Sequence, residues 1–453
     1  MEGKRLSLGT KLGFGVCDLG GNLFFTIMGF YLLFFLTDTS KLLAGLAGTA
    51  LLIGKLADAF VDPAVGFLSD RTRTRWGRRR PFMFVGCILL LFLMIVMYTN
   101  PHIASQLWLF IWTAVAYILL MASYSMVNIP YGALTPELSP DFDERTTLNA
   151  FRMTFAVVGT FIGAALVLPI VGAFTNKDLG WLAMGAIMGA VMTITALITV
   201  FTIREPAPKL IQQEKPRERI FATYASALKL KPFLLAMFTY ASHIVGITIV
   251  QGALLYYFKY IYNAEGKFQI ALTIFLVCVV ISIPVWTMIS KRIGKKLSYN
   301  LGMGLFAAVV IAFFFVGKGR GVGVMYVTMA IAGLGNSTNY VMPFAILPDV
   351  TELDYSRTGV RREGVFYGLW NFTLKVGQAF ATALIGWILA AFGYVPDAAQ
   401  TATSQLGIRL LVGPLSAVFF IAGVVILSFY PITRKYYETQ IMPKVAEWEK
   451  KKT

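Results

Sequence analysis

The sequence predicts an all-α integral membrane protein. Hydrophobic residues make up 57% of the 453 residues, charged residues make up only 14%, and the mean hydropathy is +0.68. Such a chain is too apolar for an ordinary soluble domain. Many of its stretches reach the roughly 20 apolar residues that a helix needs to cross a hydrocarbon core of about 30 Å. These stretches are apolar nearly all round, whereas the strands of a membrane barrel alternate apolar and polar residues.

Twelve stretches qualify as membrane spans. The N-terminal stretch carries Asp18 and lacks a convincing small-residue cleavage site, so we interpret it as the first span and not as a signal peptide. The predicted spans are 9–37, 41–68, 81–99, 106–136, 149–173, 181–203, 232–262, 268–290, 299–317, 323–348, 365–393 and 407–432.

The net charge of +17 follows membrane topology. Lys and Arg gather after the second span and between 204 and 231, whereas the connectors after the third and fifth spans carry almost none. Because basic residues favour the cytoplasmic side, this pattern predicts that both termini are cytoplasmic. We therefore expect a lipid bilayer around the chain and no nucleic acid as a partner.

The chain divides into two similar halves. The sequence NIPYGALTPEL at 128–138 is echoed by VMPFAILPDV at 341–350, each at the end of the fourth span of its half. The connectors SDRTRTRWGRRR and SKRIGKK also correspond, and each half has a lone base in its fifth span, Arg152 and Lys375. Parallel six-helix halves are the architecture of major facilitator transporters, so we predict two pseudo-symmetric six-helix bundles.

Polar segments set the expected boundaries of these bundles. The longest polar connector follows six spans and precedes six more, which is typical of a cytoplasmic linker. We expect an N-terminal bundle at 1–203, a linker at 204–231, a C-terminal bundle at 232–433 and a basic cytoplasmic tail at 434–453.

The second span carries the most informative charges. A charged residue inside hydrocarbon costs about 2.5–3.5 kcal/mol, so such residues are functional candidates. Lys55, Asp58 and Asp62 are spaced i, i+3 and i+7 and share one helical stripe. Two carboxylates one turn apart repel and either share a proton or bind a cation, with Lys55 partly neutralising them. Pro63 leaves the carbonyl oxygen of Ala59 available to a hard cation.

The alternative for this stripe is structural, namely a packing ion pair between Lys55 and one Asp, with Asp62 hydrated near the end of the span. We favour a coupling-ion site, because three ionisable groups and a proline share the stripe.

Other polar residues are candidates for binding a solute. If the halves pack pseudo-symmetrically, Arg152 and Lys375 line a central cavity together with Asp18. Arginine binds a hydroxyl pair or a carboxylate bidentately, and lysine offers a more adaptable point charge. The alternative is charge compensation for the bases and ordinary helix packing for the aromatic residues. The further candidates are Asn128, Tyr131, Trp370 and Asn371.

Enzyme motifs are missing from the sequence. It contains no G-x-x-x-x-G-K-[ST] phosphate loop, no H-E-x-x-H and no C-x-x-C. We expect no enzyme activity, no organic cofactor and no obligate protein partner.

Several runs resemble one transporter family. These are GFGVCDLGGNLFF in span 1, GKLADAFVDPAVGFLSDRTRTRWGRRRPF, NIPYGALTPELSPDFDERTTLNAFR, and YGLWNFTLKVG in span 11. Together they resemble the glycoside–pentoside–hexuronide:cation symporters, the melibiose-carrier-like family of the major facilitator superfamily. The likeness covers essentially the whole chain.

The resemblance implies a role for each matched residue. Asp58 and Asp62 match the cation-binding carboxylates, and Ser125 matches a neighbouring hydroxyl position. Asp18 and Arg152 match sugar-contacting residues. Lys375 matches a lysine near both sites. The basic connector, with Asp70, Arg71 and Arg78, resembles the loop shared across major facilitators, which implies gating.

The chain also departs from the melibiose-type pattern. It has Asn128 where those carriers have an aspartate, Gly132 where they have a tryptophan, and Cys17 where they have a lysine. Val61 replaces an asparagine before the second carboxylate. These changes leave open which sugar is carried and whether the cation is sodium or a proton.

We therefore expect a multi-pass protein of the plasma (inner) membrane that carries out symport of Na⁺ or H⁺ with a sugar, glycoside or uronide by alternating access. One alternative is a carrier of the same fold for an amphiphile such as a lysolipid. The other is a membrane receptor that transports nothing.

Overall fold

The computed structural model describes residues 6–138, 141–203, 205, 220–315 and 321–450. Every extended regular element in these ranges is a helix, which confirms the all-α prediction. Eleven helices of the described part are long and apolar enough to cross a membrane. The chain is therefore a multi-pass integral membrane protein, and eleven of the twelve expected spans are single long helices within the described residues.

The difference lies at the expected span 323–348, which is a broken helix. α13 (Gly321–Asn336) ends in a 3-10 turn over Ser337–Tyr340, and α14 (Met342–Thr358) follows. Pro343 lies in the first turn of α14, where its missing N–H is tolerated. α13 has 16 residues and is too short to cross a bilayer alone, because a spanning helix needs roughly 20.

The chain forms two compact units. Unit 1 comprises Met1–Ile211, Gly266–Gln269 and Thr382–Ser404, and unit 2 comprises Gln212–Glu265, Ile270–Ala381 and Gln405–Thr453. Most of the expected linker lies outside the described residues, and from residue 220 onward it forms α9 (Ile220–Leu228). The expected tail contains α18 (Arg434–Tyr436), a π-helical turn over Tyr437–Ile441, and α19 (Met442–Lys450).

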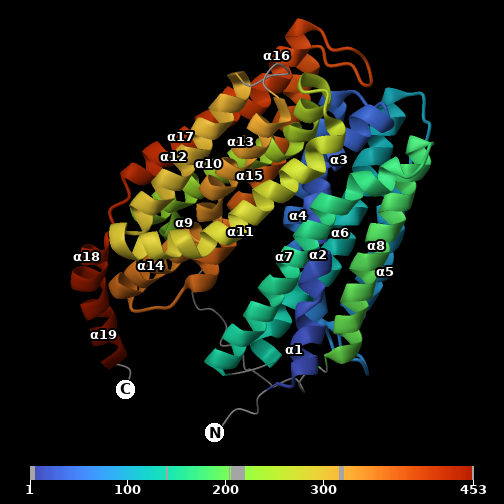
Figure 1. Cartoon of the computed structure of the whole chain (residues 1–453). Coiled ribbons are helices and arrows are strands. Elements are labelled where there is room, and N and C mark those ends of the chain that lie inside the picture. Colours follow the sequence, from blue (N-terminus) through green and yellow to red (C-terminus); the bar gives the residue numbers. More distant parts are fainter. Residues whose placement is uncertain (1–5, 139–140, 204, 206–219, 316–320, 451–453) are drawn as a thin grey trace. The chain divides into compact units, whose positions relative to one another are not determined.

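Unit 1 is a bundle of long helices. α4 packs along α6, α6 along α5, and α5 along α8, while α2 packs against both α7 and α8 (Figure 1). The bounds are α1 (Leu8–Gly15), α2 (Cys17–Phe30), α3 (Leu32–Phe34), α4 (Ala44–Arg71), α5 (Arg80–Met97), α6 (Gln106–Leu138), α7 (Phe142–Gly172) and α8 (Lys177–Thr202).

Two glycines of α7 let α2 approach closely. A Cβ atom at Gly159 would collide with the carbonyl oxygen of Leu19, and one at Gly163 would lie 3.0 Å from Thr26. Small residues at a helix crossing allow this kind of contact in membrane proteins. The crossing brings Asp18 of α2 within reach of α7.

A buried apolar cluster supports the same region of unit 1. It draws on α1, α2, α5, α6, α7 and α8, so it fixes these helices against one another. Tyr131, one of the candidate residues, belongs to it, and the cluster holds its ring in place. The members are Phe14, Cys17, Met83, Cys87, Val127, Tyr131, Leu134, Leu148, Ala196, Val200 and Ile203.

Unit 2 is built around α10, which is buried along most of its length. α17 packs against α10 and α12, and α13 packs against α12. The first part of α15 belongs to unit 2, and its residues from Thr382 onward belong to unit 1. The bounds are α10 (Lys231–Tyr256), α11 (Phe268–Ile293), α12 (Lys295–Phe315), α15 (Glu363–Ala391), α16 (Ala402–Leu410) and α17 (Ser416–Ser428).

Candidate functional site

The two carboxylates of α4 share one hydroxyl group. Ser125 Oγ of α6 lies 2.8 Å from Asp58 Oδ1 and 2.6 Å from Asp62 Oδ1. A serine hydroxyl carries one hydrogen, so it donates to one carboxylate at a time. The other short contact suits a proton on an aspartate or a cation among the three oxygens, because two carboxylates this close repel.

Local packing places this carboxylate cluster, Asp58, Asp62 and Ser125. Gly54 of α4 faces the ring of Tyr117 on α6, where a Cβ atom would overlap the ring, so the two helices lie close together. Asp58 is buried, with 5% of its surface exposed. α4 continues through Pro63, whose missing N–H deprives one carbonyl of α4 of its usual donor, and Lys55 is half-buried one turn before Asp58.

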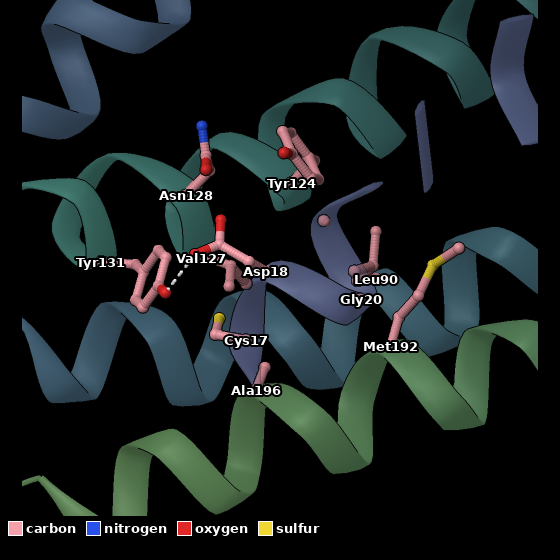
Figure 2. A pocket seen from close by; sticks show the side chains of 11 residues that line it. Cys17, Asp18, Gly20, Leu90, Tyr124, Val127, Asn128, Tyr131, Met192 and Ala196 are labelled. Atoms are coloured by element: carbon pink, nitrogen blue, oxygen red, sulfur yellow. Dashed lines mark hydrogen bonds between the residues drawn. The ribbon is translucent and has the colours of Figure 1, made fainter. Parts of the chain in front are cut away.

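A second cluster joins α2, α6 and α7. Arg152 Nε donates to Asp18 Oδ2 at 2.6 Å, and Arg152 Nη2 donates to Asp18 Oδ1 at 3.4 Å. Tyr131 Oη donates to Asp18 Oδ2 at 2.5 Å (Figure 2). One oxygen of Asp18 therefore holds two strong donors, and the other has one long contact.

The start of α7 positions Arg152. Asp141 caps this helix, and its Oδ1 accepts from the backbone N–H of Glu144 at 2.8 Å. Glu144 in turn accepts from the backbone N–H of Leu6 at 2.7 Å and forms an ion pair with Lys11 at 2.9 Å. These contacts tie α1 to α7 about two helical turns before Arg152.

The rest of the Arg152 guanidinium is also occupied. Nη1 donates to Thr135 Oγ1 at 3.0 Å and lies 3.5 Å from Asn149 Oδ1. Its Cζ lies 4.7 Å from the centroid of the Tyr131 ring. The two donors with which Arg152 could bind a solute bidentately, Nε and Nη2, therefore contact Asp18 within unit 1.

A pocket opens beside this second cluster. It is small, and its lining combines apolar side chains with the polar groups of Asp18, Tyr124, Asn128 and Tyr131. Three lining residues, Tyr124, Asn128 and Tyr131, share one stripe of α6 at spacings of four and three residues (Figure 2). The full lining is Cys17, Asp18, Gly20, Gly21, Leu90, Tyr124, Val127, Asn128, Tyr131, Met192 and Ala196.

α6 links the pocket to the carboxylate cluster. Tyr124 lines the pocket, and the next residue, Ser125, contacts both carboxylates of α4. The Tyr124 ring stacks on Phe24 of α2, with ring centroids 4.4 Å apart. A shift of α6 at this level therefore affects both places.

The remaining predicted solute contacts belong to unit 2. All three lie on α15: Trp370 is buried and stacks on Tyr240 with ring centroids 4.5 Å apart, Asn371 is exposed, and Lys375 is half-buried. The structure thus brings Asp18, Asn128, Tyr131 and Arg152 together within unit 1, and it places the other three on a single helix.

The basic connector after α4 is held by acidic residues. Arg78 pairs with Glu137 of α6, and Arg79 pairs with Glu137 at 2.9 Å and with Asp70 at 3.2 Å. Arg71 lies over the Phe67 ring at 3.8 Å. Of the basic residues here, Arg79 is the buried one, and the sequence had not singled it out.

Glu205 was also missed by the sequence. Its carboxylate accepts the backbone N–H groups of Arg78, Arg79 and Arg80 at 2.7–2.8 Å, at the start of α5. A helix N-terminus offers such free donors and favours an anion. Nothing local in the sequence points to this contact. Thr135 and Asn149, which contact Arg152, were missed too. Helical spacing from Tyr131 and Arg152 would have found them, because each lies about one turn away.

A multi-pass helical fold that carries charged side chains within its membrane-spanning helices, with an Asp–Arg pair beside a pocket, is typical of a secondary transporter. A sequence model of the family described as "MFS/sugar transport protein" matches residues 13–434, and the chain belongs to that family. This confirms the resemblance drawn from the sequence. The chain is a transporter and not an enzyme.

Three known proteins illustrate the likeness. The glucuronide carrier protein homolog of Escherichia coli is 29% identical, with 96% of this chain and 95% of that protein covered. The isoprimeverose transporter of Lactiplantibacillus pentosus is 29% identical, with 94% and 88% covered. A solved bacterial homolog of the human lysosomal transporter Spinster matches with a TM-score of 0.67 at 13% identity, covering 95% and 97%, and this match speaks for the fold alone.

Proposed function

We propose that the protein carries out symport of a sugar or glycoside with a cation, Na⁺ or H⁺, by alternating access in the inner membrane, with both termini cytoplasmic. The observation that carries the proposal is the carboxylate cluster, in which Asp58, Asp62 and Ser125 bring three oxygens together. The names of the relatives, which include sugar carriers and symporters, support the sugar. No organic cofactor enters the proposal.

Coupling follows from the shared helix. A cation or proton on the cluster removes the repulsion between the two carboxylates and draws α4 and α6 together through Ser125. Because α6 also lines the pocket through Tyr124 and Asn128, occupancy of the cluster and of the pocket influence each other. Such coupling is reciprocal, so the solute must also raise the affinity for the cation.

Proteoliposomes that hold the purified full-length chain test this proposal. A sodium gradient and a proton gradient, imposed separately, are compared for their ability to drive accumulation of radiolabelled sugars and glycosides. We expect one of them to drive uptake. Asp58→Asn and Asp62→Asn should each lower that accumulation by more than about tenfold while leaving downhill exchange of solute measurable.

Glu438→Gln is the matched control, because Glu438 is an exposed carboxylate whose partner is Arg434 on the same helical segment. It should accumulate solute like the wild type. Undiminished accumulation in both Asp58→Asn and Asp62→Asn would refute the proposal, and so would the lack of any gradient-driven uptake in the wild type.

A further inference from the structure

The charges around the pocket indicate what kind of sugar it takes. Asp18 is the one charged residue among those that line the pocket. Its charge is balanced by Arg152, so the pair as a whole is neutral. A solute that enters the pocket therefore meets no net positive charge from its lining.

Arg152 has little left to offer an anion. Nε and Nη2 donate to Asp18, Nη1 faces Thr135 and Asn149, and one face of the guanidinium lies on the Tyr131 ring. A guanidinium has five N–H donors, and the contacts above engage four of them. One remaining donor cannot form the two parallel bonds with which arginine binds a carboxylate. A sugar carboxylate could gain the fork only by displacing Asp18.

The groups that remain suit hydroxyl groups. Asp18 directs one oxygen to Tyr131 and the other toward the side of the pocket where Asn128 lies (Figure 2). A carboxylate oxygen only accepts, whereas the Asn128 amide both donates and accepts. A sugar hydroxyl can donate to Asp18 Oδ1 and accept from the amide. A carboxylate on the sugar cannot donate, and it would be repelled by Asp18.

We propose that the pocket of unit 1 selects a neutral glycoside over a uronide or another anionic sugar. This rests on the proposed function and deepens it by naming the substrate class. The names of the family members include both a glucuronide carrier and a transporter of the neutral sugar isoprimeverose, so family membership does not decide between the classes. The Asp18–Arg152 pair favours the neutral class, because it gives the pocket no net positive charge.

Matched sugar pairs provide the test. The purified full-length chain in nanodiscs is titrated with 4-nitrophenyl glucoside against 4-nitrophenyl glucuronide, with the galactoside against the galacturonide, and with the xyloside as a neutral sugar without C6. Each pair differs only in the oxidation of C6. We expect at least one neutral probe to bind and its uronide to bind at least about tenfold more weakly.

Asp18→Asn separates the proposed cause from a mere loss of contacts. It keeps the shape of the side chain but releases the Arg152 fork and leaves its positive charge unbalanced. The ratio of uronide affinity to neutral affinity should rise at least about tenfold in this variant. The same ratio should return toward its wild-type value in the double variant Asp18→Asn with Arg152→Gln, where the positive charge is also gone. Glu438→Gln should keep the wild-type ratio.

Each result decides between the two proposals. If a wild-type uronide binds as tightly as its neutral partner and a gradient drives its accumulation, symport stands and neutral selectivity is overturned. If a neutral probe binds at least about tenfold more tightly than its uronide but no gradient drives its uptake, symport fails and selectivity stands. If no neutral probe binds, selectivity is overturned.

Discussion

Ser123 and Ser125 are both buried on α6, but their hydroxyl groups have different partners. Ser125 Oγ contacts Asp58 and Asp62, whereas Ser123 Oγ donates to the carbonyl oxygen of Leu120 in its own helix at 2.8 Å. Two equally buried hydroxyl groups of the same helix can therefore be compared, one in contact with two carboxylates and one bonded within its own helix.

Ser125→Ala should weaken cation coupling. Loss of a hydrogen bond to a charged group costs about 1.5–3 kcal/mol, so the cation concentration for half-maximal uptake should rise by about tenfold or more. Ser125→Thr keeps the hydroxyl and should retain most of the coupling. Ser123→Ala is the control and should stay within about twofold of the wild type in the same uptake titration. Equal shifts in Ser123→Ala and Ser125→Ala would contradict a cation role for Ser125.

Single charges in the site could be predicted from the sequence, because an ionisable residue in an apolar stretch stands out. Asp18, Asp58, Asp62 and Arg152 were all found in this way. The resemblance also implied Ser125 as a neighbour of Asp58 and Asp62. The pairing of Arg152 with Asp18 could not be fixed, since it depends on how closely α2 and α7 approach. That approach also decides what Arg152 can bind. The sequence left two roles open for Arg152, solute binding and charge compensation, and the structure pairs its guanidinium with Asp18.

At the scale of the helices, glycine positions set the geometry of the site. Gly159→Leu should push α2 away from α7, because any side chain at this position meets the carbonyl oxygen of Leu19. Overpacking of this kind costs about 1–3 kcal/mol, and we expect a lower Tm together with weaker sugar binding. Thermal unfolding and a binding titration on the same sample measure the two effects.

Gly172 provides the control on the same helix. A Cβ atom there meets nothing within 4 Å, so Gly172→Ala should leave sugar binding unchanged. Its Tm should match or slightly exceed that of the wild type, because alanine restricts the unfolded chain more than glycine does. A Gly159→Leu variant with wild-type Tm and wild-type affinity would show that the crossing does not position the site.

The sequence did not predict the break in the helix before α14. Pro63 and Pro343 lie in similarly apolar stretches, yet α4 continues through its proline and the tenth span does not. The 3-10 turn before α14 is accompanied by Ser337 Oγ and Thr338 Oγ1, which donate to carbonyl oxygens three residues earlier. Such hydroxyls compete with helix hydrogen bonds, but their choice depends on packing that spacing alone does not reveal.

At the scale of the whole molecule, the internal repeat predicts matching ion pairs. In the first half Arg78 of the connector pairs with Glu137, which ends the fourth span. In the second half Lys295 Nζ lies 2.7 Å from both carboxylate oxygens of Asp349, at the equivalent place in α14. Each pair lies within its own unit. The repeat seen in the sequence therefore extends to how each half fastens its connector.

Charge reversal tests the second of these pairs. Lys295→Glu should lower Tm, and adding Asp349→Lys should restore part of the loss. A coupling energy of about 0.5–1 kcal/mol is expected, because the lysine is partly exposed. The same cycle on Arg434 and Glu438, an exposed pair, should give a coupling near zero. A coupling for Lys295 and Asp349 no larger than for this control would mean that the pair does not hold the connector.

The C-terminal segment was expected as a basic tail, but it packs on α14. Ile441 and Val445 are buried, and Trp448 Nε1 donates to the carbonyl oxygen of Ser356 at 3.3 Å. The Trp448 ring also fills the space beside Gly359, whose φ of +66° ends α14 in the left-handed conformation. The tail therefore covers the end of α14 and behaves as part of unit 2.

Trp448→Ala should loosen this contact. We expect a loss of about 1–3 kcal/mol for a half-buried tryptophan, seen as a lower Tm. Trypsin should also cleave faster after Lys444, because a protease needs the local helix to open and α19 opens more readily once it leaves α14. Val445→Ala removes less apolar surface, so it should also lower Tm and speed cleavage, but by smaller amounts.

The control for this prediction is Ala446→Gln, a substitution at an exposed position of the same helix. Glutamine is a good helix former and its side chain extends into solvent, so neither Tm nor the rate of cleavage should change appreciably. Unchanged cleavage in Trp448→Ala would show that the tail gains nothing from packing on α14.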